Sequence, residues 1–369
     1  MASSTKKENL FRIEPNPSEL RECRDYSKYE EKLKELDGKG SMHVEKLGAV
    51  THKYASWKNQ GDEKSLDTVS WNIYGAYAGN PKASARVLIT GGMHGEEPAG
   101  VLAALEACKE LSKPETALGR MLENTYFMVV PTVDPESYDF KGRKFVDRDG
   151  RSDPEPMKGG KSWEDLNGCW GRRLFENLPD ELKIIRPKVD EFKPTLHFDL
   201  HETVYGRSMA KMGGSRAQYN MTHGDRQGLM ILQSLPEGMA DSAGLGNEIL
   251  GNIRERGHKT YTPTLLYKIL LPIISKSQLP QTIPLNKDYS LAKIGPLISE
   301  AKIQVASMYV SDKFKAQSYT FETFENLLDE RVAEHLAGIE GALKTYTGSG
   351  TIATNPKTPT INYAQKRTK

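Results

Sequence analysis

The stretch from Val87 to Gly100, with the sequence VLITGGMHGEEPAG, constrains the fold of this chain more than any other part. Val87–Thr90 form a short run of apolar and β-branched residues, which is typical of a buried strand. The two glycines that follow allow a sharp turn. Pro98 suits the first turn of a helix, and apolar residues recur at helical spacing after it. The pattern predicts a strand, a tight turn and a helix, the unit from which α/β domains are built.

Two residues with metal-binding chemistry lie in that turn. His94 and Glu97 are three residues apart at the C-terminal end of the predicted strand, where open α/β sheets place their ligands. Imidazole nitrogen and carboxylate oxygen are both zinc ligands, and a catalytic zinc takes three protein ligands and a water. The same spacing also describes a surface histidine beside an acidic helix start, where a glutamate is favourable. The metal hypothesis therefore needs a third ligand.

A second predicted strand offers the third ligand. Leu196–His201 read as a strand that contains two histidines on one face, His197 and His201. Four residues at about 3.3 Å each separate them by about 13 Å, so only one of the two can reach the ion. A strand histidine is otherwise most often a hydrogen-bonded core residue. We choose His201 as the ligand because it lies nearer the C-terminal end of the strand.

A hydrolytic zinc site also needs a general base, which takes a proton from water and passes it to the leaving group. Glu322 lies in Tyr319–Phe324, where residues alternate as they do in a strand. A carboxylate among aromatic side chains is expected to have a raised pKa through desolvation, which suits this role. The alternative is an exposed glutamate on the solvent face of an edge strand.

Composition excludes several classes of function. The chain has 369 residues, 37% of them hydrophobic and 27% charged, which suits a soluble globular protein with one large domain or two. The net charge of +2 predicts neither nucleic acid nor membrane as a partner. Its three cysteines are too far apart for a disulfide framework or a cysteine zinc site. The N-terminus lacks the apolar core of a signal peptide, and no apolar run approaches the roughly 20 residues of a membrane helix. We therefore expect a cytoplasmic protein.

Strand and helix patterns alternate along the chain, which predicts an α/β domain with a largely parallel or mixed sheet. We expect this domain to span residues 18–346, between a polar tail (1–17) and a disordered C-terminal tail (347–369). Residues 134–171 are rich in turn-forming residues and far longer than an ordinary connection, which is typical of a functional loop. The predicted strands are 44–52, 68–77, 87–90, 126–130, 196–201 and 319–324, and the predicted helices are 29–36, 98–111, 179–192, part of 236–256, 299–314 and 328–346.

Taken together, these stretches resemble the zinc carboxypeptidase family and its relatives, the succinylglutamate desuccinylase/aspartoacylase group. The resemblance covers about residues 27–346 and rests on several motifs in the family's order. His94-Gly-Glu-Glu97 is similar to the family's HxxE, Asp134-Pro135 to its Asn-Pro, Asp165–Trp170 to its D-x-N-R-N-W, Asp199-Leu-His201 to the segment of the third ligand, and Thr320-Phe-Glu322 to the segment of the catalytic glutamate.

The resemblance implies a fold, a cofactor and roles for the residues. The fold would be an α/β/α sandwich around a mixed, largely parallel sheet. One zinc ion per chain would be held by His94, Glu97 and His201. Glu322 would act as the base and proton shuttle, and a zinc-activated water would attack the scissile carbonyl.

The chain departs from the family pattern at Gly168, where the family usually has an arginine that clamps the substrate's terminal carboxylate. Asn167 beside it is retained and is a predicted substrate-binding residue. A bidentate arginine–carboxylate pair is hard to replace, so another arginine is expected to bind the substrate. The segment 141–151 resembles the loop of the family's oxyanion-stabilising arginine, for which Arg148 is the first candidate and Arg151 the second. The further candidates for carboxylate recognition are Arg143, Arg172, Arg173 and Arg207.

Three functions fit these features. The first is a carboxypeptidase-like hydrolase that removes a residue from a small peptide, with Arg148 and zinc stabilising the oxyanion. The second is a deacylase that acts on small N-acyl amino acids, which the Asp-Leu-His segment favours. The third is a catalytically inactive relative that serves as a binding module, which is disfavoured because all predicted ligands and the base are present.

Overall fold

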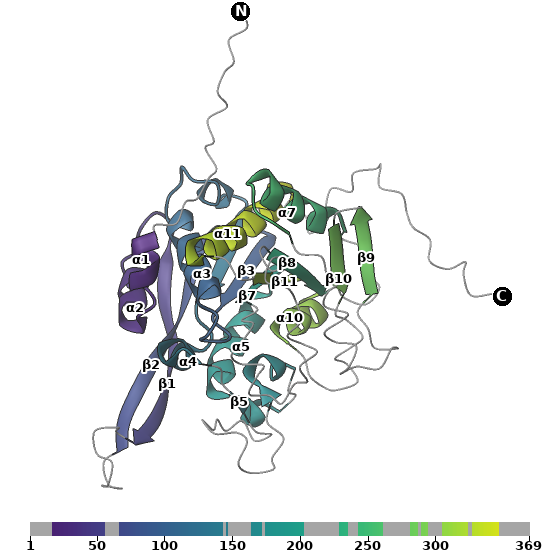
Figure 1. The fold of residues 1–369 in the computed structure, drawn as a ribbon. Helices are drawn as coiled ribbons and strands as arrows, with labels where there is room; N and C mark the ends of the chain where they lie inside the picture. The colour runs from purple at the N-terminus through teal and green to yellow at the C-terminus, as the bar shows by residue number, and fades with distance from the viewer. Residues whose placement is uncertain are drawn as a thin grey trace, which may run out of the picture.

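The computed structural model describes residues 17–55, 66–142, 145–146, 164–171, 174–202, 229–234, 243–260, 281–286, 289–293, 305–323 and 327–346. In these residues the chain forms a nine-stranded sheet (Figure 1). In spatial order its strands are β1 (His43–Ala55), β2 (Leu66–Gly79), β4 (Thr125–Val130), β3 (Ala85–Gly91), β7 (Leu196–Glu202), β11 (Gln317–Thr323), β8 (Leu229–Ser234), β10 (Tyr289–Lys293) and β9 (Gln281–Asn286). A separate pair consists of β5 (Phe145–Val146) and β6 (Glu164–Asp165).

The sheet is mixed, with its parallel part at the centre. β4, β3, β7 and β11 run parallel to one another. On one side β2 pairs antiparallel with β4 and with β1, and on the other β8 pairs antiparallel with β11. Since parallel strands end at the same edge, the C-terminal ends of β3, β7 and β11 lie side by side. Such an edge is where α/β proteins bind ligands.

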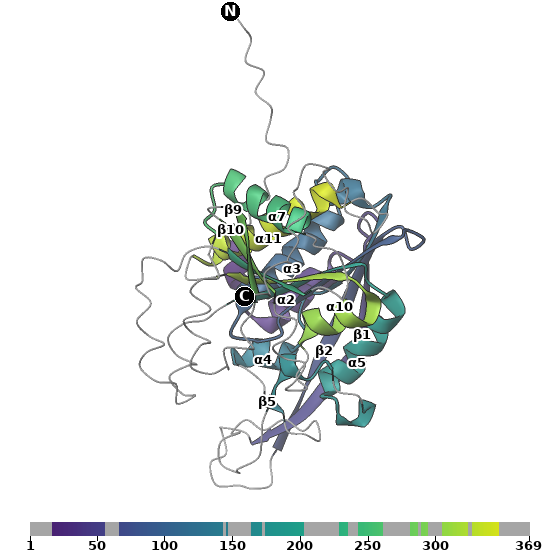
Figure 2. The same ribbon diagram turned by 90° about the vertical axis from the view of Figure 1, so that its right-hand side faces the viewer.

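Helices cover both faces of the sheet, as Figure 2 shows with the sheet close to edge-on. On one face α3 contacts β3 and β7, while α11 contacts β11, α3 and α7. On the other face α10 contacts β7 and β11, and α5 contacts β1. The predicted α/β/α sandwich is therefore confirmed. The helices are α1 (Pro17–Glu22), α2 (Tyr26–Lys34), α3 (Pro98–Leu111), α4 (Pro135–Phe140), α5 (Asp180–Phe192), α7 (Ala243–Glu255), α10 (Ala306–Phe314) and α11 (Leu328–Thr345), with 3-10 turns at Gly119–Met121, Leu166–Gly168 and Phe175–Asn177.

The strand β7 separates two kinds of environment because its side chains alternate between the faces. All seven of its residues are buried. Phe198 and Leu200 face the helices α3 and α11 and belong to the hydrophobic core, and each such side chain contributes about 1.5–3 kcal/mol when buried. His197, Asp199 and His201 point to the opposite face. The core thus fixes the strand, and the strand positions the polar row.

The strongest patterns in the sequence predicted their elements closely. The helix 98–111 has the predicted bounds, and the strands predicted at 87–90, 126–130 and 196–201 are confirmed within two residues at each end. None of the helices in the described ranges combines the length and apolar character that a membrane crossing requires.

Other predictions need correction. Residues 134–171 are not a loop throughout, because α4 begins directly after Asp134, whose side chain accepts a hydrogen bond from the Ser137 amide at 3.0 Å and so caps the helix. The strand β8 was not predicted, since only its first four residues are apolar and so short a run gives no periodic signal. Two predicted helices also shift, as α10 begins at Ala306 and not at 299, and α2 spans Tyr26–Lys34 and not 29–36. The helix α1 was not predicted. The apolar stretch 265–274, for which the sequence pattern predicts neither helix nor strand, and the two predicted tails (apart from Pro17) lie outside the described residues.

Candidate metal centre

The turn after β3 is shaped by two glycines. Gly92 has a φ of 62°, which L side chains rarely adopt, and an added Cβ there would lie 2.6 Å from Val101. Gly95 packs directly against α4, because its added Cβ would lie 1.8 Å from the carbonyl oxygen of Ser137. The backbone amide of Asp134 also donates to the Gly92 carbonyl at 2.9 Å. These contacts hold the turn, and therefore His94, against the start of α4.

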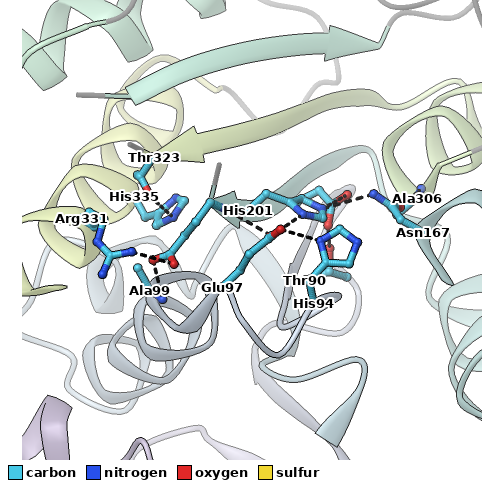
Figure 3. A network of polar contacts seen from close by, with 12 residues as sticks. Thr90, His94, Glu97, Ala99, Asn167, His201, Ala306, Thr323, Arg331 and His335 are labelled. Carbon is cyan, nitrogen blue, oxygen red and sulfur yellow. Dashed lines mark hydrogen bonds and ion pairs between the residues drawn. The ribbon is translucent and has the colours of Figure 1, made fainter. Parts of the chain in front are cut away.

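Three side chains from two distant segments meet at this edge of the sheet. Nδ1 of His94 lies 2.7 Å from Oε1 of Glu97, and Nδ1 of His201 lies 2.9 Å from the other oxygen of the same carboxylate. Each of the three residues offers a ligand atom within 4.8 Å of the others, and the three are at most 5% exposed. Two imidazoles and a carboxylate are a donor set that fits a catalytic zinc, which leaves a position for water. The predicted ligand residues are therefore brought together, as Figure 3 shows.

The charges of this group balance one another. Burial disfavours the ionised carboxylate, but the adjacent imidazoles of His94 and His201 hold the pKa of Glu97 well below its ordinary value. Burial likewise opposes the imidazolium of His201, and Asp199 with Glu97 outweighs it and holds the pKa of His201 well above its ordinary value. Glu97 is therefore ionised in this buried site and is balanced by the imidazolium of His201. A bound cation would replace that proton, because a metal-binding imidazole is neutral.

Asp199 supports His201 from behind. Its Oδ2 lies 3.1 Å from Nε2 of His201, on the opposite side of the ring from Glu97. Its other oxygen accepts a hydrogen bond from Thr90 at 2.8 Å. A carboxylate in this position fixes the ring orientation and tautomer of a metal-binding histidine. The alternation of β7 is the signal that reveals this role, since residues two apart share a face.

His197 belongs to the core. Its Nε2 lies 2.9 Å from Thr90 and its Nδ1 2.8 Å from Ser318, so both ring nitrogens have neutral partners. Burial lowers the pKa of His197 to about 4, which keeps the ring neutral. The geometry agrees with the sequence argument that only the second histidine of this strand lies at the ligand edge.

Glu322 lies on the strand next to His201. In the parallel pair of β11 and β7 the two residues are register partners, and neighbouring strands are about 4.8 Å apart. Register partners point to the same face of a sheet, so Glu322 extends on the face that holds the ligand histidine. Its side chain is half-buried, which places it between the core and solvent.

Asn167 comes from a third segment, the 3-10 turn Leu166–Gly168. Its Nδ2 lies 3.4 Å from Nε2 of His201, and its Oδ1 accepts a hydrogen bond from the Ala306 amide at 3.0 Å. The residue therefore lies at the centre, held by the start of α10. The candidate arginines 143, 148, 151, 172, 173 and 207 lie outside the described residues.

Two charged residues beside the centre were not identified from the sequence. Glu202 follows His201 and points to the helical face, where its Oε2 lies 2.7 Å from Nη1 of Arg331 in α11. Burial raises the pKa of Glu202 to about 7, although Arg331 acts in the opposite direction. No local pattern pairs residues so far apart, so only the packing of α11 on the sheet reveals them.

A second group of acidic side chains lies where the start of α4 meets the start of α5. Asp134, Glu136 and Glu181 are buried and offer oxygens within 4.8 Å of one another. Asp134 caps α4, and Glu136 lies 2.8 Å from Nδ1 of His52. These contacts give the first two acids roles in the fold.

Comparison with known proteins agrees with this geometry. Residues 59–206 match the family model of the zinc carboxypeptidases. This segment contains the turn with His94 and Glu97, as well as Asn167 and His201. No curated protein matches the chain at a significant level.

Solved structures share the fold at low sequence identity. A metallo-carboxypeptidase from Burkholderia cenocepacia aligns with a TM-score of 0.50 at 14% identity, over 86% of this chain and 68% of its own. Thrombin activatable fibrinolysis inhibitor aligns with a TM-score of 0.51 at 12% identity, over 87% of this chain and 73% of its own. A protein from Shewanella amazonensis SB2B, assigned as a metallopeptidase, aligns with a TM-score of 0.50 at 12% identity, over 88% of this chain and 94% of its own.

Proposed function

We propose that this chain is a zinc-dependent hydrolase that cleaves the amide bond of a small peptide near its C-terminus, because residues 59–206 match the family model of the zinc carboxypeptidases. One zinc ion would be held by His94, Glu97 and His201. The carboxypeptidase-like peptidase is the first candidate function, with a single metal and a glutamate base.

The observation that carries this proposal is the convergence of three buried donors from the β3–α3 turn and from β7 at one edge of the sheet. A buried ionised carboxylate requires a positive partner, which the protonated His201 or a bound cation supplies. The half-buried carboxylate of Glu322 on the adjacent strand supplies the remaining chemical group that a hydrolase requires.

The residues of the chain would divide the chemistry among them. When bound, zinc supplies Lewis-acid chemistry that polarises a carbonyl and acidifies a water. Glu322 would accept the proton of the attacking water and return it to the departing nitrogen. Asp199 would hold the ring of His201, and Asn167 would bind substrate beside it. Arg148, or Arg151 in its place, would stabilise the oxyanion.

Zinc content and a hydrolysis panel test the proposal together. The purified full chain is expected to contain one zinc per chain and to release single C-terminal residues from peptides, as followed by mass spectrometry. A chelator should abolish the release, and added zinc should restore it. A chain that binds zinc and leaves free and blocked peptides intact would contradict the peptidase function.

A deacylase is the second candidate, and Gly168 favours it. Gly168 follows Asn167 in the 3-10 turn beside the centre, is buried and carries no side chain. A plain carboxypeptidase would have a clamping arginine there, so the carboxylate of the substrate must be recognised in another way. The panel therefore includes N-acyl amino acids beside the peptides. Hydrolysis of these alone would establish the deacylase and exclude the peptidase.

A further inference from the structure

A buried ion pair lies directly behind the proposed ligand Glu97. It joins Glu202 at the end of β7 to Arg331 in α11, with 2.7 Å between Oε2 and Nη1, and the carboxylate side chain is only 1% exposed. We propose that Glu202 and Arg331 are positioning residues, which hold Glu97 in the orientation that binds the metal. This inference rests on the metal site of the proposed function.

The N-terminus of α3 has an unusual cap. The amides of the first helical turn lack partners within the helix, and the N-cap side chain usually accepts a hydrogen bond from one of them. Glu97 is the N-cap residue of α3, yet its side chain makes no cap hydrogen bond. Oε1 of Glu202, 103 residues further along the chain, accepts the hydrogen bond of the Ala99 amide at 2.8 Å instead. The side chain of Glu97 can therefore turn to the histidines.

Glu202 also contacts the proposed ligand Glu97 directly. The backbone amide of Glu202 donates to Oε2 of Glu97 at 3.1 Å. The same oxygen lies 2.9 Å from Nδ1 of His201. Residue 202 thus contacts the ligand carboxylate through its amide and holds the helix that carries this carboxylate through its side chain. Figure 3 shows the continuous network from Arg331 past Ala99 to Glu97 and His201.

The buried pair of Glu202 and Arg331 is costly for the fold. Removing two charges from water costs several kcal/mol for each ion, and apolar residues of similar volume are often as good for stability. Glu202 points to the face where Leu200 belongs to the hydrophobic core. The burial of this ion pair is therefore weak evidence for a purely stabilising role. A positioning role explains why a carboxylate lies here. It can accept the hydrogen bond of the Ala99 amide while Arg331 fixes the orientation of the carboxylate.

Matched substitutions in full-length protein separate positioning from packing. In an Arg331→Met background, Glu202→Met removes the acceptor for the Ala99 amide, and Glu202→Gln keeps it at nearly the same volume. The measurements are zinc affinity by competition with a chromogenic chelator, the visible spectrum of the Co²⁺ form, and thermal unfolding of the metal-free protein. Glu202→Met is expected to lower zinc affinity about 10- to 100-fold and to alter the Co²⁺ spectrum. The zinc affinity of Glu202→Gln is expected to stay within about threefold of that of the Arg331→Met protein with Glu202 intact.

A second buried ion pair on the same helix provides the control. Arg256, in the turn directly after α7, contacts Glu340 of α11, and the carboxylate is 2% exposed. The double substitution Arg256→Met with Glu340→Met should leave zinc affinity unchanged. If the Met variant at position 202 does not fold, Glu202→Ala in the same background removes the same acceptor with less crowding.

The outcomes are distinct. Equal zinc affinity in the Met and Gln variants at position 202 would overturn the positioning role, as would an equal loss in the control pair. A wild-type chain that binds no zinc would instead overturn the proposed function.

Discussion

At the scale of single residues, neighbouring positions of β7 have different tasks because each step along the strand changes the face. Asp199 and His201 point to the metal edge, while Leu200 joins the core on the other face. Although burial disfavours its charged form, the imidazolium of His201 holds the pKa of Asp199 below its ordinary value. A register shift of one residue would exchange these faces and destroy both the site and the core.

Glu322→Gln tests the proton shuttle. The amide keeps the size of the side chain and cannot accept a proton, so turnover should fall about 10²- to 10⁴-fold. Zinc content should stay at one per chain, since Glu322 is not a proposed ligand. Turnover is measured on the best substrate of the panel, with zinc determined on the same sample. Unchanged turnover would exclude Glu322 as the base.

His197→Asn tests the neutral core histidine. The pKa of His197 is about 4 in the folded chain and about 6.5 in the unfolded chain. Between these values the unfolded state binds more protons, so this histidine's contribution is complete above pH 6.5 and is lost as the pH falls towards 4. The stability advantage of wild type over the variant should therefore shrink by about 3 kcal/mol between pH 7.5 and pH 4. Denaturant unfolding with a chelator present measures this difference.

Ser318→Ala is the matched control for that experiment, because it removes a hydrogen-bond partner of His197 without removing the titrating ring. The advantage of wild type over Ser318→Ala should change much less with pH. A pH-independent difference for His197→Asn as well would mean that the ring is not held neutral.

At the scale of elements, the sequence predicted those strands and helices whose signals lie within a few neighbouring residues. The β3 strand, its turn and α3 were predicted because an apolar run, two glycines and Pro98 all act within a few residues. The short helix α4 was missed because its capping by Asp134 resembles an ordinary turn in the sequence. The strand β8 was missed because only four of its residues are apolar and its partners β10 and β11 both follow it by more than fifty residues.

In the candidate site, too, the residues marked by a local sequence pattern were predicted, and those defined only by packing were not. His94 and Glu97 could be predicted because they follow an apolar strand, and His201 because it lies near the C-terminal end of another. Glu202 and Arg331 could not, since a buried carboxylate on a core face contradicts the hydrophobic pattern and its partner lies on a distant helix. Asn167 was predicted from the resemblance alone, and its contact with Ala306 depends on the packing of α10.

Gly95→Ala tests the turn that carries the first two ligands. The new methyl group would clash with the backbone of Ser137, so the turn must move. We expect a loss of about 1–3 kcal/mol in stability and a loss of at least about tenfold in zinc affinity. Gly251→Ala in α7 is the control, because its added Cβ meets nothing within 4 Å. That variant should gain about 0.5–1 kcal/mol and bind zinc like wild type.

At the scale of the whole molecule, the sheet brings together ligands that are about a hundred residues apart in the chain. The order of β3, β7 and β11 places His94, His201 and Glu322 at one edge, whereas the unfolded chain has no such site. Proteins with 12–14% identity share this fold, which agrees with a framework set by strand order and core packing more than by particular side chains.

Zinc should therefore stabilise the folded chain. A ligand that binds only the native state at a thousandfold its Kd raises the free energy of unfolding by about 4 kcal/mol. Thermal unfolding with and without zinc should show a corresponding rise in Tm for wild type. His94→Ala and His201→Ala should show little or no rise. An equal rise in the two variants would locate the stabilising ion at another site.

The most direct measurement is an anomalous difference map from crystals of the zinc-loaded chain, recorded at the zinc absorption edge. We predict one strong peak per chain, bounded by Nδ1 of His94, the carboxylate of Glu97 and Nδ1 of His201, with Glu322 facing it. A peak at any other place, or zinc-loaded crystals without density between these three side chains, would contradict the account.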